Sequence, residues 1–205
     1  MMRGIERLLL ENRISPIAGV DEAGRGACAG PLLVVALILR NPVDRELAQV
    51  RDSKKLSEKQ REELYEIIVE NSLSVSVIEI SSSNIDERGV HLANIEGMRR
   101  AVQGLSLMPG YVLTDGYAIP GLAISSLGVW KGDQVVRTIS AASIIAKVRR
   151  DRIMRAFDTD FPEYGFARHK GYVTAAHSAA LAQFGPCDIH RRSFANVAIH
   201  IHREV

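Results

Sequence analysis

Four acidic residues of the chain could form a metal centre. Asp21, Glu22, Asp115 and Asp133 each lie at, or just beyond, the end of an apolar strand candidate, with glycine or another small residue close by. Strand ends in one sheet can meet at one edge, and carboxylates crowded there repel one another unless a cation neutralises them. Hard oxygen ligands favour Mg²⁺ or Mn²⁺. The sequence therefore predicts a divalent metal centre built from these carboxylates.

The pair Asp21 and Glu22 gives the strongest indication of function. Asp115 or Asp133 taken alone fits a turn former, because a single Asp beside glycine commonly bonds the nearby backbone. Two adjacent acids directly after a buried strand and before residues 24–26 have no comparable structural explanation. We therefore interpret the pair as functional.

The loop after this pair allows two interpretations. Residues 24–29 satisfy the loose dinucleotide-binding pattern G-x-G-x-x-A, which suggests a nucleotide-dependent oxidoreductase. That fold needs a helix to open inside the loop, whereas Pro31 and the apolar run behind it predict another strand. The conformation of residues 27–39 therefore decides between the two. We favour a loop in which Gly24 and Gly26 let the backbone approach a sugar-phosphate chain, with Arg25 available for a phosphate.

The elements that must position these residues follow from hydrophobic periodicity and capping signals. A short helix is expected at the N-terminus, and Ser57 with Gln60 forms a capping-box pattern before a further helix. Strands are predicted over residues 14–20, 32–39, 73–80, 111–116 and 122–129, and helices over 58–70, 93–105, 139–157 and 174–185. This order favours a mixed sheet covered by helices, an α/β fold.

Length and composition are those of one globular domain. The chain has 205 residues, of which 46% are hydrophobic and 24% charged, and it lacks the run of roughly 18 apolar residues that a membrane span needs. The N-terminal segment carries Glu6 and Glu11 and fails as a secretory signal. Cys28 and Cys187 lack metal-ligand spacing and fit buried or idle thiols. We expect a single cytoplasmic domain with no membrane contact.

The distribution of charge is more informative than its sum. A net charge of +2 is too small to identify a nucleic-acid binder. Basic residues gather at residues 54–55, 99–100, 147–155, 168–170 and 191–192. A basic stripe beside an acidic pocket is consistent with this pattern.

Seven motifs in sequence order resemble the bacterial ribonuclease HII family, over residues 16 to 197. The short motifs are weak individually, but their common order makes chance agreement implausible. They are Asp21-Glu22-Ala23-Gly24-Arg25-Gly26, Asp52-Ser53-Lys54-Lys55-Leu56, Asp115-Gly116, Lys131-Gly132-Asp133, Ala141-Ala142-Ser143-Ile144-Ile145-Ala146-Lys147-Val148, His169-Lys170-Gly171-Tyr172 and His190-Arg191-Arg192-Ser193-Phe194.

The resemblance implies a ribonuclease H-like fold, with a mixed five-stranded sheet flanked by helices. Residues 1–205 would form one catalytic domain, in which residues from about 158 to 205 are a C-terminal helical substrate-binding extension. Four carboxylates, matching Asp21, Glu22, Asp115 and Asp133, would hold two divalent ions, Mg²⁺ or Mn²⁺. We expect the protein to be a monomer.

The resemblance also implies a set of substrate contacts. The loop matching Gly24, Arg25 and Gly26 would contact the 2′-hydroxyls around the cleaved bond, which is the group that separates RNA from DNA. Tyr172 would pack against the deoxyribose at an RNA-to-DNA junction; without the resemblance, an ordinary half-buried core tyrosine is the preferred interpretation. Further contacts are expected from Lys54, Ser143, Lys147, Lys170 and Arg191.

The predicted function is that of a metal-dependent endoribonuclease. It would hydrolyse the RNA strand of RNA–DNA hybrids and cut 5′ of ribonucleotides embedded in duplex DNA, leaving a 5′-phosphate and a 3′-hydroxyl. Two divalent ions would activate water and stabilise the departing oxygen. The alternative is a non-catalytic RNA–DNA hybrid-binding module, which would keep the basic residues but would not need four acids.

Several residues depart from the family pattern or have a simpler explanation. Ala27-Cys28 stands where many members carry Pro-Leu, and residues 134–137 replace a lysine and a serine that commonly follow Gly-Asp. The second change could alter phosphate contacts or metal preference. Asp151 is expected to pair with Lys147 or Arg155 at four-residue spacing. His177, His200 and His202 show no zinc spacing and are expected on the surface.

Overall fold

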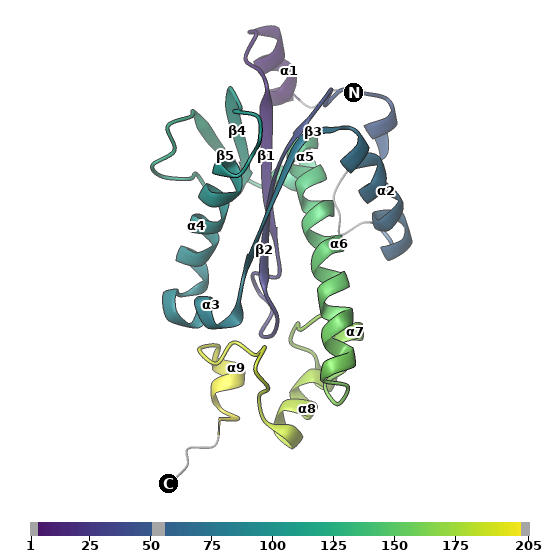
Figure 1. Cartoon of the computed structure of the whole chain (residues 1–205), viewed down its shortest axis with the longest axis vertical. Helices are drawn as coiled ribbons and strands as arrows, with labels where there is room; N and C mark the ends of the chain where they lie inside the picture. Colours follow the sequence, from purple (N-terminus) through teal and green to yellow (C-terminus); the bar gives the residue numbers. More distant parts are fainter. Residues whose placement is uncertain (1–3, 51–55, 202–205) are drawn as a thin grey trace.

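The computed structural model describes residues 4–50 and 56–201. Its centre is a five-stranded sheet with the strand order β3-β2-β1-β4-β5 (Figure 1). β2 (Leu32–Leu39) pairs antiparallel with β1 (Ile17–Ala23) and β3 (Ser72–Ile80), whereas β4 (Tyr111–Asp115) is parallel to β1 and β5 (Ser126–Val129). The predicted mixed five-stranded sheet is confirmed.

Helices cover both faces of the sheet. α2 (Glu58–Glu70) and α6 (Arg137–Asp160) pack on one face, and α3 (Ser82–Arg88) and α4 (Val90–Gln103) pack on the other. The shorter helices are α1 (Gly4–Glu11), η1 (Glu46–Gln49), α5 (Gly132–Val135), α7 (Phe166–His169), α8 (Ala175–Phe184) and α9 (Ala195–Ala198). None of the helices in the described part of the chain combines the length and apolarity that a membrane span requires.

The interior strand β2 is apolar on both faces because helices cover both. Val35 and Leu37 face the core beneath α2 and α6, and Val34 and Ala36 face the core beneath α3 and α4. All four side chains are fully buried. Burial on both faces explains why this strand is a continuous apolar run without polar alternation.

Two contacts fix the start of α6 against β1. A Cβ at Gly19 would lie 2.2 Å from the carbonyl carbon of Thr138, so only glycine permits this approach. The buried Glu6 carboxylate of α1 accepts the backbone N–H groups of Arg137 and Thr138, at 2.9 and 2.8 Å. These are amides of the first turn of α6, which otherwise lack partners. α6 is thereby held directly over the strand that carries Asp21.

Element boundaries agree with the sequence where a local signal exists. The predicted helix 58–70 and strand 32–39 coincide with α2 and β2, and the capping box of Ser57 and Gln60 is present. β1 begins and ends three residues later than predicted. Asp21 and Glu22 therefore lie inside the strand, paired with β2, rather than after it.

The C-terminal segment is helical, as predicted. α7, α8 and α9 lie beyond one end of the sheet (Figure 1). The helix expected over residues 174–185 is α8, in which the Thr174 side chain accepts the backbone N–H of His177 and Gly185 ends the helix. α8 is followed by the short α9, so it is not the last helix as expected.

Candidate active site

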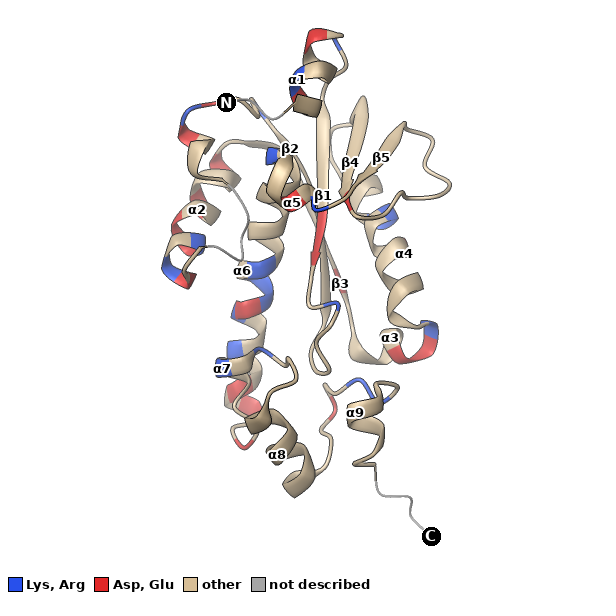
Figure 2. Ribbon diagram, turned by 180° about the vertical axis from the view of Figure 1, so that it is seen from behind, with Lys and Arg blue, Asp and Glu red and all other residues tan. Residues whose placement is uncertain are grey.

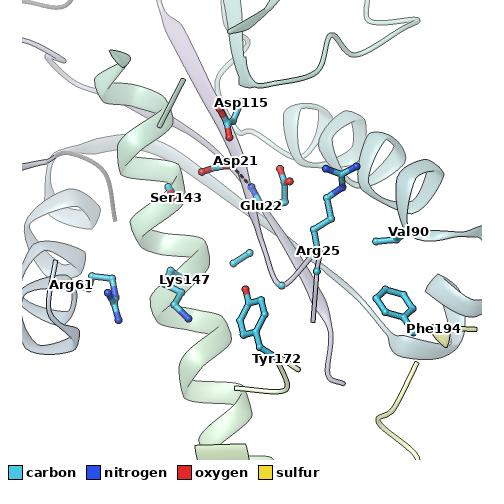
Figure 3. A pocket seen from close by; sticks show the side chains of 13 residues that line it. Asp21, Glu22, Arg25, Arg61, Val90, Asp115, Ser143, Lys147, Tyr172 and Phe194 are labelled. Carbon is cyan, nitrogen blue, oxygen red and sulfur yellow. Dashed lines mark hydrogen bonds between the residues drawn. The ribbon is translucent and has the colours of Figure 1, made fainter. Parts of the chain in front are cut away.

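A pocket of about 600 Å³ opens over the middle of the sheet. Asp21 and Glu22 of β1 and Asp115 of β4 form its acidic part (Figure 3). Basic residues of α6 lie close to this acidic segment (Figure 2). Three of the four carboxylates predicted from the sequence therefore line one pocket. Residues 24–26, which follow Asp21 and Glu22 in the chain, line the same pocket.

The parallel pairing of β1 with β4 brings the acids together. The register of the two strands pairs Val20 with Thr114, directly before Asp21 and Asp115. Because neighbouring strands lie roughly 5 Å apart, the two carboxylates start from adjacent backbone positions. The expected meeting of acids from different strands is what the sheet topology produces.

Backbone amides hold one carboxylate oxygen of Asp21 and one of Asp115. Asp21 Oδ1 accepts the N–H of Glu22 at 2.8 Å, and Asp115 Oδ1 accepts the N–H of Gly132 at 2.6 Å. The Ser143 hydroxyl of α6 also hydrogen-bonds Asp21. These bonds orient the aspartates and leave further lone pairs for another ligand.

Burial and mutual repulsion disfavour the ionised acids. Burial raises the pKa of Asp21 well above its usual value, and the charges of Glu22 and Asp115 raise it further. The pKa of Glu22 rises from 4.5 to about 7, mainly through burial and then through Asp115, while Arg25 opposes the rise. A cation would offset both the burial and the repulsion.

Glu22 should make the metal-free protein less stable as the pH rises. Between pH 4.5 and about 7 the folded state holds a proton that the unfolded state has lost, so the free energy of unfolding falls with pH across this window. We expect Glu22→Gln to remove the contribution of Glu22 to this fall and to stabilise the metal-free protein at pH 8 by up to roughly 3 kcal/mol. Urea unfolding in EDTA at pH 5 and pH 8 measures the difference.

The matched control for this prediction is the exposed Glu63, whose replacement by Gln should leave the pH dependence as in the wild type. An unchanged fall in stability between pH 5 and pH 8 in the Glu22 variant would contradict the assigned cause.

The donor set of the pocket fits a divalent cation. Glu22 Oε2 is buried and has no hydrogen-bond partner within the described residues. Carboxylate oxygens are the ligands that Mg²⁺ and Mn²⁺ prefer. Over residues 4–50 and 56–201, no three His, Cys, Asp or Glu side chains form a ready-made metal site. Asp21, Glu22 and Asp115 do not form a preformed site, but they are the carboxylates of this pocket that could hold a cation, which would offset their repulsion.

Asp133 does not line this pocket. It lies in α5 with 2% exposure, one residue after the Gly132 amide that binds Asp115. Asp133 thus follows in the chain the residue whose amide binds the pocket residue Asp115. Its role as a metal ligand stays a prediction.

Residues 24–26 form a tight turn that lines the pocket after β1. Gly24 has a φ of 90°, and a Cβ there would lie 1.9 Å from Arg150 Nε, so the position requires glycine. The Arg25 guanidinium lies 4.8 Å from the centre of the Tyr117 ring. Behind the turn, residues 32–39 form strand β2. The helix that a dinucleotide-binding loop needs is replaced by a strand, which rules out that interpretation.

Arg191 holds this loop through hydrogen bonds from its guanidinium. Its guanidinium is fully buried and donates to the carbonyls of Gly30, at 3.0 and 3.1 Å, and of Arg25, at 3.0 Å. The predicted phosphate contact of Arg191 stays a prediction, and the buried guanidinium has a structural role. Burial also lowers its pKa to about 9.

Two cationic side chains line another part of the pocket. Lys147 of α6 donates to Asp151 at 2.7 Å, which confirms one of the two pairings predicted for Asp151. Arg61 of α2 lies 3.8 Å from the other oxygen of the same carboxylate. Arg155, the alternative partner, instead binds Glu62 at 3.0 Å. The Asp151 carboxylate therefore holds two cationic side chains, Lys147 and Arg61, at the pocket wall.

Tyr172 and Ser143 also lie where substrate contacts were predicted. The half-buried Tyr172 ring lines the pocket, 5.6 Å from the Lys147 ammonium and 5.4 Å from the Arg150 guanidinium. Figure 3 shows its hydroxyl directed toward the acids. The tyrosine is half-buried, as expected without the resemblance, but it faces a cavity rather than a closed core.

Of the other two lysines predicted as contacts, one lies outside the pocket and one outside the described residues. Lys170 is 9% exposed, and its ammonium donates to the carbonyl of Ala167, outside the pocket lining. Burial lowers its pKa. Lys54 and the rest of residues 51–55 lie outside the described residues.

Arg61, Val90 and Phe194 line the pocket but were not predicted. Arg61 offered one local signal: it lies in the first turn of α2, where a basic residue is unfavourable for the helix dipole and so suggests another role. Val90 and Phe194 reach the pocket through the packing of α4 and the C-terminal segment, and their local sequence carries no such signal.

The two departures from the family pattern lie outside the pocket lining. Cys28 is fully buried. Arg137 donates through its guanidinium to the carbonyl of Pro42 at 2.8 Å, and through its amide to Glu6. These contacts stabilise the fold around α6, which gives residues 134–137 a structural role.

Comparison with known proteins points in one direction. The family model described as Ribonuclease HII matches residues 18–197. Proteins named Ribonuclease HII from Frankia casuarinae and Mycobacterium avium are 56% and 57% identical, each over 96% of this chain and over 82% and 85% of their own length. The crystal structure of ribonuclease H2 from Pyrococcus horikoshii OT3 superposes with a TM-score of 0.78 at 27% identity, covering 90% of this chain and 96% of that chain. The predicted ribonuclease H-like fold is confirmed.

Proposed function

The chain belongs to the ribonuclease HII family and is a metal-dependent endoribonuclease with ribonuclease H activity, and we propose that it also cuts 5′ of single ribonucleotides in duplex DNA. Enzymes of this family act on RNA–DNA hybrids. The observation that supports the finer proposal is one pocket that joins three carboxylates, the turn 24–26 and Tyr172. A non-catalytic binding module would have no use for buried acids with raised pKa values.

The acids of the pocket would provide the reaction centre. Asp21, Glu22, Asp115 and Asp133 would hold two divalent ions, Mg²⁺ or Mn²⁺. When bound, such ions activate a water molecule for in-line attack and stabilise the departing 3′ oxygen. The resulting products are a 5′-phosphate and a 3′-hydroxyl.

The remaining pocket residues would position the nucleic acid. The backbone of residues 24–26 can approach the 2′-hydroxyl because Gly24 and Gly26 carry no side chain. Arg25, Arg61 and Lys147 present positive charge to backbone phosphates. Ser143 keeps Asp21 oriented.

Tyr172 would distinguish the RNA-to-DNA junction. Its ring would pack against the deoxyribose on the DNA side of that junction, whereas the cleaved bond lies on the 5′ side of the ribonucleotide. The C-terminal helical segment, from about residue 158, would place this ring and extend the contact with the duplex. The protein would act as a monomer on both long hybrids and DNA duplexes that contain ribonucleotides.

A pair of duplexes tests the proposal. One carries a single ribonucleotide and the other is all DNA, and each is offered with Mg²⁺, with Mn²⁺ and with EDTA. We expect cutting of the first duplex alone, on the 5′ side of the ribonucleotide and with metal only. Tyr172→Ala should reduce this cutting at least about tenfold while cutting of a long RNA–DNA hybrid falls much less. Cutting of the all-DNA duplex, or a cut on the 3′ side, would contradict the proposal.

A further inference from the structure

A buried cluster of histidines and cysteines lies beneath the turn that carries Tyr172. His177 and Cys28 are fully buried, His190 is 2% exposed, and Cys187 is partly buried. The prediction that His177 lies on the surface is therefore wrong. None of these side chains lines the pocket described above.

The hydrogen bonds of the cluster determine which nitrogen of each ring carries the proton. The Cys187 backbone N–H, which can only donate, lies 3.0 Å from His190 Nδ1, so this nitrogen accepts and the proton is on Nε2. His190 Nε2 lies 3.0 Å from His177 Nε2, which must then accept. His177 therefore carries its proton on Nδ1, 3.0 Å from the carbonyl of Tyr172.

The two ends of this chain of hydrogen bonds require the same positions for the ring protons. The Tyr172 carbonyl can only accept, so it independently demands a proton on His177 Nδ1. Burial lowers the pKa of His177, and burial together with His177 lowers the pKa of His190 to about 4. Both rings are therefore neutral near pH 7, which is the only charge state in which all three hydrogen bonds exist.

The same turn is held from a second side. His169 Nδ1 accepts the N–H of Gly171 at 3.2 Å, and His169 Nε2 lies 2.8 Å from the carbonyl of Tyr164. The His169 ring stacks on His177, with centroids 4.3 Å apart and planes 13° apart. The carbonyl of Gly171 accepts the N–H of Cys28 at 2.9 Å. The main chain before Tyr172 is thereby fixed to the segment that follows residues 24–26, and the carbonyl of Tyr172 itself to His177.

We propose that His177 and His190 are positioning residues for the reaction: a directed chain of hydrogen bonds, from the Cys187 amide through both rings to the Tyr172 carbonyl, sets the placement of the Tyr172 ring in the pocket. The functional part of this inference rests on the proposed role of Tyr172 at the RNA-to-DNA junction. The chain of hydrogen bonds itself rests only on the distances between the Cys187 amide, the two rings and the Tyr172 carbonyl. Its loss would affect cutting at single ribonucleotides more than cutting of long hybrids.

Two substitutions of His177 separate positioning from packing. The side-chain nitrogen of Asn occupies nearly the place of Nδ1, so His177→Asn can still donate to Tyr172. His177→Gln places its polar atoms near Nε2, so it can still accept from His190 but leaves the Tyr172 carbonyl without its donor. Asn removes more volume than Gln, so loss of packing would make the Asn variant the worse of the two.

The measured quantity is the ratio of the cutting rate on a single-ribonucleotide duplex to the rate on a long hybrid, in Mg²⁺. This ratio cancels any loss of folded enzyme, which thermal unfolding measures separately. We expect His177→Gln to lower the ratio about five- to tenfold, the effect of one lost hydrogen bond, and His177→Asn to keep it within about twofold of the wild type. Equal ratios for the two variants, or a lower ratio for Asn, would overturn the inference.

Two further measurements make the outcome specific. Nitrogen-15 NMR of the wild type at pH 7 should show His177 protonated at Nδ1 and His190 at Nε2, and the opposite assignment for either ring would overturn the chain. Tyr172→Ala reports on the proposed function. If it leaves the ratio unchanged, the role of Tyr172 is wrong and the functional inference falls with it; if it lowers the ratio but His177→Gln does not, only the positioning role is wrong.

Discussion

Asp21→Asn should reduce cleavage of an RNA–DNA hybrid by at least about 10³-fold, because it removes a charge from the carboxylates that would hold the catalytic ions. The substitution is close to isosteric, and the amide oxygen can still accept the N–H of Glu22. The fold should therefore persist. Single-turnover cleavage in saturating Mg²⁺, and separately in Mn²⁺, measures the loss.

Binding should respond differently from turnover. In EDTA, the affinity of Asp21→Asn for the uncut hybrid should equal or exceed that of the wild type, because Arg25, Arg61 and Lys147 remain and one charge that repels phosphate is gone. Asp160→Asn, at the exposed end of α6, is the matched control and should leave both quantities unchanged. Full turnover in the Asp21 variant would show that this carboxylate is not part of the reaction centre.

The sequence predicts those parts of the fold that depend on local signals. α2 was predicted to the residue because its capping box and apolar spacing act within one helix, and β2 because burial on both faces makes it continuously apolar. The end of β1 was placed too early, because the sequence turns acidic at Asp21. Pairing with β2, a contact between distant residues, continues the strand through Glu22 to Ala23.

The acidic part of the pocket was accessible to sequence reasoning for a related reason. Asp21 and Asp115 stand at the same level of two strands whose apolar segments are easy to recognise, so only their parallel pairing had to be assumed. Asp133 has no such strand: it lies in the short helix α5, and the sequence could not say where this helix directs its side chain.

Charged and polar residues away from strand ends were harder to place. Arg191 and His177 have ordinary surface composition around them, yet both are fully buried. Their partners, the Gly30 carbonyl and the His190 ring, are supplied by tertiary packing of the C-terminal segment. Arg61 was missed for the opposite reason, since it lies on a polar helix face that packing with α6 turns into a pocket wall.

Arg150→Met should destabilise the protein by roughly 3–5 kcal/mol, because it leaves buried carbonyls without their donor. The Arg150 guanidinium has 0% exposure and donates to the carbonyls of Ala29 at 2.9 Å, Pro31 at 2.9 Å and Lys170 at 2.8 Å. The carbonyls of Ala29 and Pro31 belong to the loop after residues 24–26, and the carbonyl of Lys170 lies two residues before Tyr172. One side chain therefore fixes the loop after residues 24–26 and the turn before Tyr172 relative to each other.

The neighbouring Arg152→Met provides the control for this prediction. Arg152 lies on the same helix but is 43% exposed, and its ion pair with Glu62 is of the kind that contributes at most about 1 kcal/mol. Urea unfolding should therefore separate the two variants by several kcal/mol. At temperatures where both are folded, the Arg150 variant should also cut more slowly, since its two loops would then be joined mainly by the backbone hydrogen bonds to the Gly171 carbonyl. Equal stability of the two variants would mean that the loops hold their positions without Arg150, and that the packing of α7 and α8 orders the pocket instead.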